Sequence, residues 1–274
     1  MEWNILTRKI QIVKLIVILC VVCLYADGKH RSITCSTEKR CQCSKWGSFV
    51  FANCSGLNLK LSPNFTKDVA SIDLGQNLLK DIPFNLPHHL THLNLAENPR
   101  IKAVKSNAFT RLLNLRHLVL SRCNLKHIDS GAFEKNRKLE HLDISDNQEL
   151  TLSVLRNISF DLRQSQLKYL FLNKVQCTYG ITTVFRFEYI KHLKNTPLKK
   201  MSIASNRITY FEHNVLGNMP SFLEEINVED NYLSFGIYLF QLNRLKSLKY
   251  LNASFQSSFH KKTSIYNACN DSGM

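Results

Sequence analysis

Four cysteines near the N-terminus form the densest group of reactive side chains in this 274-residue sequence. Cys35, Cys41, Cys43 and Cys54 follow the spacing C-x5-C-x-C-x10-C. Close-set cysteines either bind zinc or form disulfides. Because the paired C-x2-C spacing that presents four thiolates to zinc is missing, the cluster predicts disulfides in an exported chain, with no metal site and no cofactor.

A second group of candidate reactive residues, Asp143, His141 and Ser145, has the side chains of a hydrolase without its surroundings. Neighbouring residues of a strand point to opposite faces. Neither a nucleophile elbow nor a phosphate-binding loop adjoins the three residues. We therefore expect no catalytic residues, and the chain is predicted not to be an enzyme.

The N-terminus has the features of a secretory signal peptide. Arg8, Lys9 and Lys14 precede or border an apolar run over residues 15–25. This run is shorter than the about 20 residues that span a bilayer, although an uncleaved signal anchor is the alternative. We expect residues 1–28 to be removed, which leaves a secreted chain without a membrane span of its own.

Eight copies of the template L-x-x-L-x-L-x-x-N fill residues 66–256, and successive copies begin 21 to 31 residues apart. The L-x-L alternation predicts a short strand with one apolar face, and parallel stacking of such strands buries those faces in one core. The pattern therefore predicts an α/β leucine-rich-repeat solenoid, a horseshoe with a parallel concave β-sheet and irregular convex segments.

The Asn that closes each repeat is expected to turn inward and bond backbone groups of neighbouring coils. Cys123 holds this position in the third repeat and can act as a weak donor, whereas Val175 in the fifth repeat cannot. The fifth repeat is therefore expected to be irregular. Its two flanking intervals, 28 and 31 residues, are the longest in the array.

The exposed positions of the predicted strands form two columns on the concave face, where rigid strands present side chains to solvent. Three histidines in successive repeats predict a pH-sensitive patch, and the alternative is an ordinary variant of the repeat. The candidate ligand-binding residues of the two columns are His92, Asn94, His117, His141, Asp143, Tyr169, Phe171 and Lys200.

Positive charge is concentrated in one part of a chain whose formal net charge is +15. Residues 99–139 contain ten Lys or Arg and two acidic residues. This basic band predicts a protein ligand or an anionic microbial or glycan ligand; a nucleic acid is a further candidate, and a solvated flank is the alternative. Its principal members are Arg100, Lys102, Lys105, Arg116, Arg122 and Lys126.

Asn-x-Ser/Thr triplets predict N-glycosylation, as expected for an exported chain. The candidate acceptors are Asn64, Asn157 and Asn252.

The cysteine cluster and the repeats together resemble a known family. The cluster with its Asn-Cys-Ser-Gly-Leu stretch at residues 53–57 is similar to the N-terminal cap of extracellular leucine-rich-repeat proteins, and the repeats that follow resemble Toll-like receptor ectodomains, particularly invertebrate ones. The resemblance implies a cap over residues 29–65 with Cys35 paired to Cys43 and Cys41 to Cys54. It also implies pattern recognition in innate immunity, receptor homo- or heterodimers, and an endosomal lumen if the chain is part of a longer receptor.

The C-terminal end departs from that family. Residues 257–274 form a polar tail with a lone Cys269 and without a C-terminal cysteine cap. The chain is therefore expected to be a receptor truncated before its membrane span and signalling domain, acting as a soluble decoy or co-receptor. A matrix or adhesion protein of the small-proteoglycan type and a soluble leucine-rich-repeat antigen receptor are the alternatives.

Overall fold

The computed structural model describes residues 33–176, 183–234, 242 and 244–256. The predicted signal peptide and the polar tail, as well as Cys177 and Cys269, lie outside these described residues. Two compact units divide the chain, Met1–Ile33 and Thr34–Met274. Everything that follows concerns the second unit.

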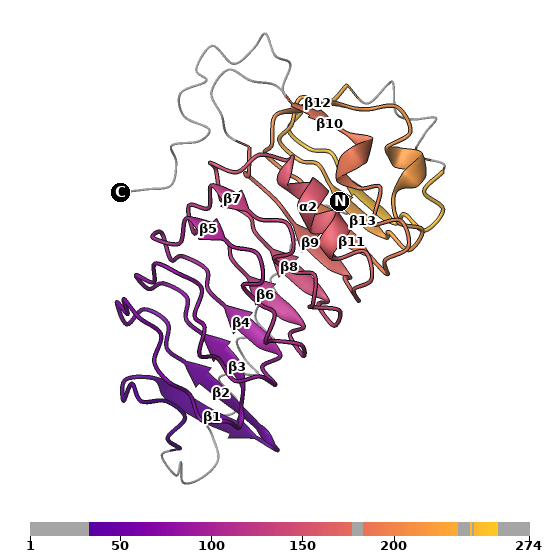
Figure 1. The fold of residues 1–274 in the computed structure, drawn as a ribbon. Coiled ribbons are helices and arrows are strands. Elements are labelled where there is room, and N and C mark those ends of the chain that lie inside the picture. Colours follow the sequence, from indigo (N-terminus) through magenta and orange to yellow (C-terminus); the bar gives the residue numbers. More distant parts are fainter. Residues whose placement is uncertain (1–32, 177–182, 235–241, 243, 257–274) are drawn as a thin grey trace, which may run out of the picture. The chain divides into compact units, whose positions relative to one another are not determined.

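A ten-stranded sheet runs through this unit (Figure 1). Its first two strands pair antiparallel, and all later neighbours pair parallel. A strand lies at each of the eight L-x-L segments, so the predicted leucine-rich-repeat solenoid is confirmed, with seven full turns between the eight repeat strands. In sheet order the strands are β1 (Gln42–Trp46), β2 (Phe49–Asn53), β3 (Val69–Asp73), β4 (His92–Asn94), β6 (His117–Val119), β8 (His141–Asp143), β9 (Tyr169–Phe171), β11 (Lys200–Ser202), β13 (Glu225–Asn227) and β14 (Tyr250–Asn252).

The core lies behind this sheet and is built from the template leucines. Leu93, Leu118 and Leu142 are paired in register on β4, β6 and β8, and each is buried. Burial of one such side chain stabilises the fold by about 1.5–3 kcal/mol. Because every coil contributes the same positions, the buried side chains form one continuous column instead of a separate core in each repeat.

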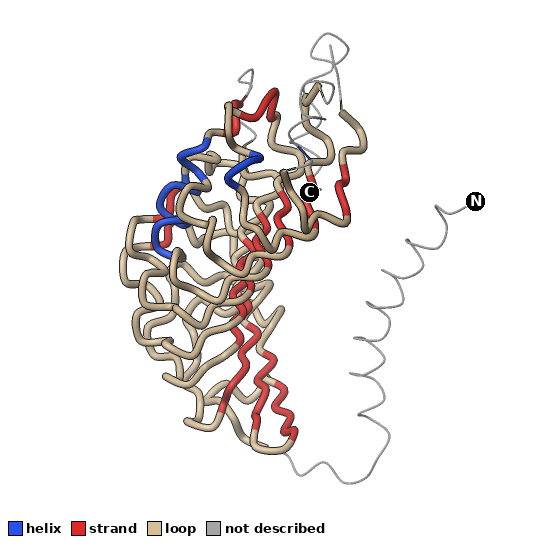
Figure 2. Tube along the Cα trace, turned by 90° about the vertical axis from the view of Figure 1, so that its right-hand side faces the viewer, coloured by secondary structure: helices blue, strands red, loops and turns tan. Residues whose placement is uncertain are grey.

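Shorter elements close the coils between β4 and β13 on the side away from the sheet (Figure 2). Phe109 and Phe133 stack there with ring centroids 5.8 Å apart. No described helix is long and apolar enough to cross a membrane. The closing elements are the paired strands β5 (Ala103–Val104) and β7 (His127–Ile128), helix α2 (Val154–Asp161), the paired strands β10 (Thr183–Phe185) and β12 (Ile208–Phe211), and the 3-10 turns η1 (Phe187–Tyr189) and η2 (Leu216–Asn218).

Helix α2 accounts for the longer interval before the fifth repeat. It turns Leu155 and Ile158 into the core. Asp161 at its end accepts hydrogen bonds from the backbone N–H groups of Gly131, at 3.0 Å, and Phe133, at 3.1 Å. The extra residues thus form a helix fastened to the preceding coil. The length of the interval predicted irregularity but not this helix.

The buried Asn ladder is present as predicted. The amide of Asn147 donates to the carbonyl oxygens of Leu120 and Ile144, at 2.9 and 2.7 Å, and its oxygen accepts from the N–H of Cys123 at 3.0 Å. In the third repeat the Cys123 thiol is the donor in place of an Asn amide, and it lies 3.2 Å from the carbonyl oxygen of Leu95 in the preceding coil. Each ladder side chain therefore joins two coils.

The N-terminal end of the solenoid is covered by the disulfide-bonded hairpin of β1 and β2. The structure pairs Cys35 with Cys43 and Cys41 with Cys54, as the resemblance implied. Cys54 and Cys35 are completely buried, so the two bridges close the first coil from its outer end.

Candidate ligand-binding face

The exposed side chains of the ten-stranded sheet form the sheet face, which corresponds to the predicted concave face. Parallel pairing places His92 beside His117, His117 beside His141, and His141 beside Tyr169. The predicted columns are therefore real columns, with one member on each strand. In order from β2 to β14 the first column reads Phe51, Ser71, His92, His117, His141, Tyr169, Lys200, Glu225 and Tyr250.

The ring column, defined as His92, His117, His141, Tyr169 and Phe171, is a continuous stack across four strands. The rings of His92 and His117 lie 4.3 Å apart and nearly parallel, at 10°, and those of His117 and His141 lie 5.6 Å apart. His141 then contacts the rings of Phe171 and Tyr169, at 5.2 and 6.1 Å. Offset stacks of this kind hold their side chains in one orientation.

A hydrogen bond with Thr91 sets which ring nitrogen of His92 carries the proton. The Thr91 hydroxyl donates to the Ala70 carbonyl oxygen at 2.8 Å and lies 2.9 Å from Nδ1 of His92. A hydroxyl has only one proton, so Nδ1 of His92 donates to the Thr91 oxygen. This leaves the Nε2 atom of a neutral His92 as a hydrogen-bond acceptor.

The environment of the ring column favours neutral imidazoles. Loss of solvent is the main reason that the pKa of each of His92, His117 and His141 lies below its usual value, and for His92 the pKa is about 4. The neighbouring His117 ring and Arg116 lower the pKa of His92 further. His92 therefore gains its charge below the pH of about 5 to 6 at which endosomal sensors titrate.

Farther along, the sheet face changes from rings to ion pairs. Lys200 on β11 pairs with Glu225 on β13 at 2.6 Å. Beyond them, Asn252 donates to Glu229 at 2.9 Å. Lys200, predicted as a ligand-binding residue, therefore has its charge already compensated within the fold, whereas the ring column has no charge to compensate.

Two predicted ligand residues have a structural role in addition. The side-chain oxygen of Asn94 accepts from the N–H of Ala96 at 3.0 Å, and that of Asp143 accepts from the N–H of Ser145 at 2.9 Å. Each side chain closes the turn that ends its strand. His141 and Asp143 are two residues apart on β8 and lie on the same face, so strand alternation does not separate them, contrary to the expectation from the sequence.

The basic band is divided between different edges of the solenoid. Arg116 precedes β6 and pairs with Glu140, which also binds Lys168 at 2.7 Å. Arg122 follows β6 and pairs with Glu97 at 3.2 Å. The remaining band residues lie nearer the β5–β7 side, where Lys126 pairs with Glu149 at 2.7 Å, and Arg100, Lys102 and Lys105 flank or precede β5. Three of the six predicted cations are thus partly neutralised, and the band is not one patch.

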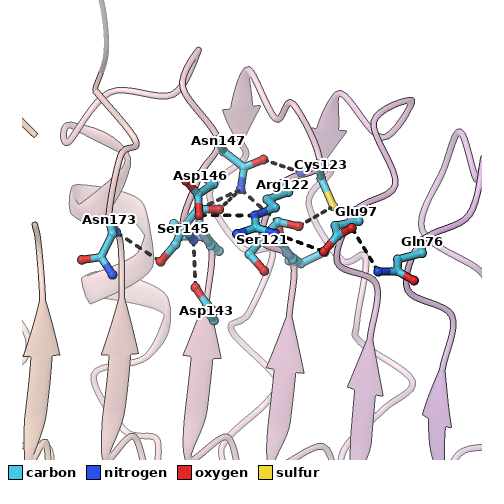
Figure 3. A network of polar contacts seen from close by, with 12 residues as sticks. Gln76, Glu97, Ser121, Arg122, Cys123, Asp143, Ser145, Asp146, Asn147 and Asn173 are labelled. Atoms are coloured by element: carbon cyan, nitrogen blue, oxygen red, sulfur yellow. Dashed lines mark hydrogen bonds and ion pairs between the residues drawn. The ribbon is translucent and has the colours of Figure 1, made fainter. Parts of the chain in front are cut away.

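Sequence reasoning missed a polar edge that runs past the ends of the strands (Figure 3). Gln76 donates to Glu97 at 3.2 Å, and Arg122 reaches both Glu97 and, at 3.6 Å, Asp146. Each of these four residues immediately precedes a ladder position, and its backbone φ lies between 54° and 57°. Counting one position back from each ladder residue would have found this edge.

The polar edge continues into a pocket of about 880 Å³. Arg122 and Asp146 line one end, and Phe255, whose side chain is 76% exposed, lines the other. The pocket combines both signs of charge with one apolar ring. Such a lining does not select one class of ligand, and the ring column is the better-defined candidate site.

The three predicted glycosylation sites differ in accessibility. Asn64 is exposed, whereas the Asn157 amide donates to the Ile128 carbonyl oxygen at 3.3 Å and Ser159 of the same triplet is completely buried. The Asn252 amide is bonded to Glu229. A glycan on the amide nitrogen of Asn157 or Asn252 would disturb these bonds, so the structure favours Asn64.

Comparisons with known proteins agree with this architecture. Residues 88–148 match the family described as Leucine rich repeat. The chain is 34% identical to Toll-like receptor 4 of Pinctada imbricata over 187 residues, which is 67% of this chain and 21% of that protein. It is 30% identical to bovine (Bos taurus) asporin over 180 residues, which is 65% of this chain and 43% of asporin.

Solved structures show the same fold at low sequence identity. Human trophoblast glycoprotein matches with a TM-score of 0.53 and 20% identity, over 82% of this chain and 73% of that one. The structure described as the TLR13-ssRNA13 complex matches with a TM-score of 0.54 and 22% identity, over 73% of this chain and 27% of that chain.

The chain is thus a leucine-rich-repeat protein related in sequence both to Toll-like receptors and to small proteoglycans. It spans only about a fifth to two fifths of the length of the first curated relatives that it matches.

Proposed function

We propose that this protein is an extracellular ligand-binding module of the Toll-like receptor type, which acts in innate immunity as a receptor fragment, decoy or co-receptor and binds its ligand on the ring column. The observation that carries the proposal is the continuous stack from His92 to Phe171 on the sheet face. The similarity to Toll-like receptor 4 over 67% of the chain supports the receptor type.

The physical reason lies in the preorganisation of the rings. Aromatic side chains have few rotatable bonds and dominate the energetics of interfaces, so rings already held in place lose little entropy when a partner binds. Tyr169 is 37% exposed and presents both a ring and a hydroxyl. Neutral imidazoles add hydrogen-bond donors and acceptors without the cost of removing water from a charge.

The N-terminal hairpin extends this surface in one direction. Phe51 on β2 precedes Ser71 and His92 in the same column, and it is 39% exposed. Trp46 and Phe49, which face each other across the hairpin, are more exposed still, at 80% and 63%. A row of rings on this scale fits a protein or glycan ligand that offers apolar surface between polar groups.

A matched pair of tyrosines tests the proposal. Tyr169 and Tyr250 lie in the same column, and Tyr250 lies beyond the ion pairs, outside the ring column. The purified chain is passed over immobilised peptidoglycan, lipopolysaccharide, β-glucan and collagen to find a binding surface. Tyr169→Ala is then expected to weaken binding at least about tenfold, as for a hot-spot residue, whereas Tyr250→Ala changes it less than about twofold.

A matrix or adhesion role is the second candidate function. The 30% identity to asporin over 65% of the chain favours it. Retention on collagen and not on the microbial polymers would select this alternative. Equal effects of the two tyrosine substitutions would contradict binding at the ring column in either role.

A further inference from the structure

A separate surface is defined by cations that recur six residues before strands of the sheet. Four successive coils place Arg111 before β6, Lys135 before β8, Arg163 before β9 and Lys194 before β11, and Arg244 precedes β14 in the same way. These five residues are called the basic flank. Two of them, Arg111 and Lys135, fall within residues 99–139, but none is among the six principal members of the basic band.

Each cation of the basic flank lies beside a buried residue. This buried neighbour follows Arg111, Lys135 and Arg244 in the chain, and it precedes Arg163 and Lys194. The residue after Lys135 is Asn136, whose amide donates to the carbonyl oxygens of Phe109 and Leu112 at 3.1 and 3.0 Å. With Asn136 fixed inward, the exposed Lys135 is turned to solvent. The buried neighbours are Leu112, Asn136, Leu162, Leu193 and Leu245.

Side chains of neighbouring coils meet along the basic flank. A guanidinium nitrogen of Arg111 lies 3.1 Å from His88 of the preceding coil. One coil farther, Lys138 donates to Asn114 at 2.7 Å. Beyond that, the ring of Phe160 contacts His192 edge-on at 5.2 Å. The cations therefore recur beside a row of contacts between coils that follows the stacking direction.

The cations of the basic flank make few ion pairs within the fold. In the described part of the chain, only Lys135 among the five has an ion pair, and its nearest oxygen, on the adjacent Glu134, is 4.0 Å away. Cations beside the strands differ, because Arg116 and Lys168 share Glu140. A row of exposed like charges repels itself, and a linear anion that runs along the row relieves this repulsion.

We propose that the basic flank binds a sulfated polysaccharide of the glycosaminoglycan kind, laid along the stacking direction of the coils. Arginine at two of the four successive positions suits oxyanion groups, because its guanidinium can donate two hydrogen bonds to one group. The site is separate from the ring column and does not depend on the function proposed for it.

The aromatic rings near the flank favour a polysaccharide over a nucleic acid. Single-stranded nucleic acids are held by bases that stack on open aromatic faces. Here the guanidinium of Arg111 lies over the Phe84 ring at 4.8 Å, and that of Arg163 lies over the Phe160 ring at 4.0 Å. One face of each ring is therefore already covered, and both arginines are held outward by the rings.

The test compares two fourfold variants of the full chain that carry the same net charge. The flank variant is Arg111→Gln, Lys135→Gln, Arg163→Gln, Lys194→Gln, and the control variant is Arg100→Gln, Lys102→Gln, Lys105→Gln, Lys126→Gln. Binding to immobilised heparin is measured at low salt, with thermal unfolding as the check that both variants fold. We expect the flank variant to bind about 30-fold more weakly if each lost contact counts as an exposed ion pair, and the control to change less than about threefold.

Further measurements decide the chemistry. Heparin stripped of its sulfates is expected to lose binding, and the double variant Arg111→Lys, Arg163→Lys, which keeps the charge, is expected to retain most of it. Equal losses in the two fourfold variants would show attraction by net charge alone and overturn the proposal. It would also be overturned by an oligonucleotide of matched charge that binds more tightly than heparin, or by the absence of heparin binding.

Discussion

Replacement of Asn147 by Ala is the sharpest test of how the coils are held together. Asn147 is completely buried, and its side chain makes contacts to backbone groups of two coils. The Ala variant leaves the N–H groups of Cys123 and Leu125 without their acceptor and the carbonyl oxygens of Leu120 and Ile144 without this donor. A buried polar group left without a partner costs about 1–3 kcal/mol.

Counting the two N–H groups at that cost, and allowing for partial relaxation of the carbonyls, we expect Asn147→Ala to lower the free energy of unfolding by about 3–5 kcal/mol. This loss lies at the top of the range for single substitutions and is comparable with the whole stability of many domains. Urea denaturation followed by circular dichroism measures it. The reasoning is refuted if the loss is below about 1 kcal/mol.

Two further variants separate the ladder from a general intolerance of substitution. Asn195 is exposed, so Asn195→Ala is expected to change stability by less than about 0.5 kcal/mol. Cys123 occupies a ladder position with a weaker hydrogen-bonding group, so Cys123→Asn is expected to stabilise the fold by about 1 kcal/mol. Destabilisation by Cys123→Asn would show that this coil has adapted to the smaller side chain.

Three other predictions follow from the same contacts. The folded-state pKa of His92 lies below its unfolded value of about 6.5, so the contribution of neutral His92 to stability is fully present above that pH. As the pH drops towards 4, the free energy of unfolding is expected to fall by about 1 kcal/mol, after allowance for solvent exposure. His92→Gln should remove that part of the pH dependence in urea titrations. Burial raises the pKa of the Cys123 thiol to about 11. Iodoacetamide should therefore label Cys123 in denaturant and leave it unlabelled in the native protein. Rapid labelling of the native protein would contradict the place of Cys123 in the ladder. Replacement of the Cys41–Cys54 bridge by two serines should cost about 2–3 kcal/mol, measured as a lower urea midpoint, and an unchanged midpoint would mean that the cap contributes little.

The repeat template predicted most of the fold because each of its positions has one physical task. Leu93, Leu118 and Leu142 are buried where alternation placed them, and Cys123 replaces Asn as a weak donor. Helix α2 was not predicted, because its apolar spacing is short and only the length of the interval marked it. The disulfide pairing came from the family resemblance, since spacing alone allows several pairings.

The sequence predicted which side chains lie in columns on the sheet face, but not the distances and ion pairs between neighbouring coils. The columns of the sheet face follow from the repeat alignment, but ring distances such as the 4.3 Å between His92 and His117 require coordinates. The basic band was counted along the sequence, whereas ion pairs form between coils about 24 residues apart. Glu140 and Glu149, which pair with Arg116 and Lys126, lie just outside the counted window.

The central claim is that ligand binds on the ring column, and side-chain oxidation footprinting tests it without any substitution. The chain is exposed to hydroxyl radicals with and without the polymer that it binds, and oxidation of individual side chains is read by mass spectrometry. Tyr169 and Phe171 are expected to be protected in the complex, whereas Tyr210, exposed on β12 away from the sheet, keeps its oxidation rate. Protection of Tyr210 with unchanged oxidation of Tyr169 and Phe171 would contradict the account.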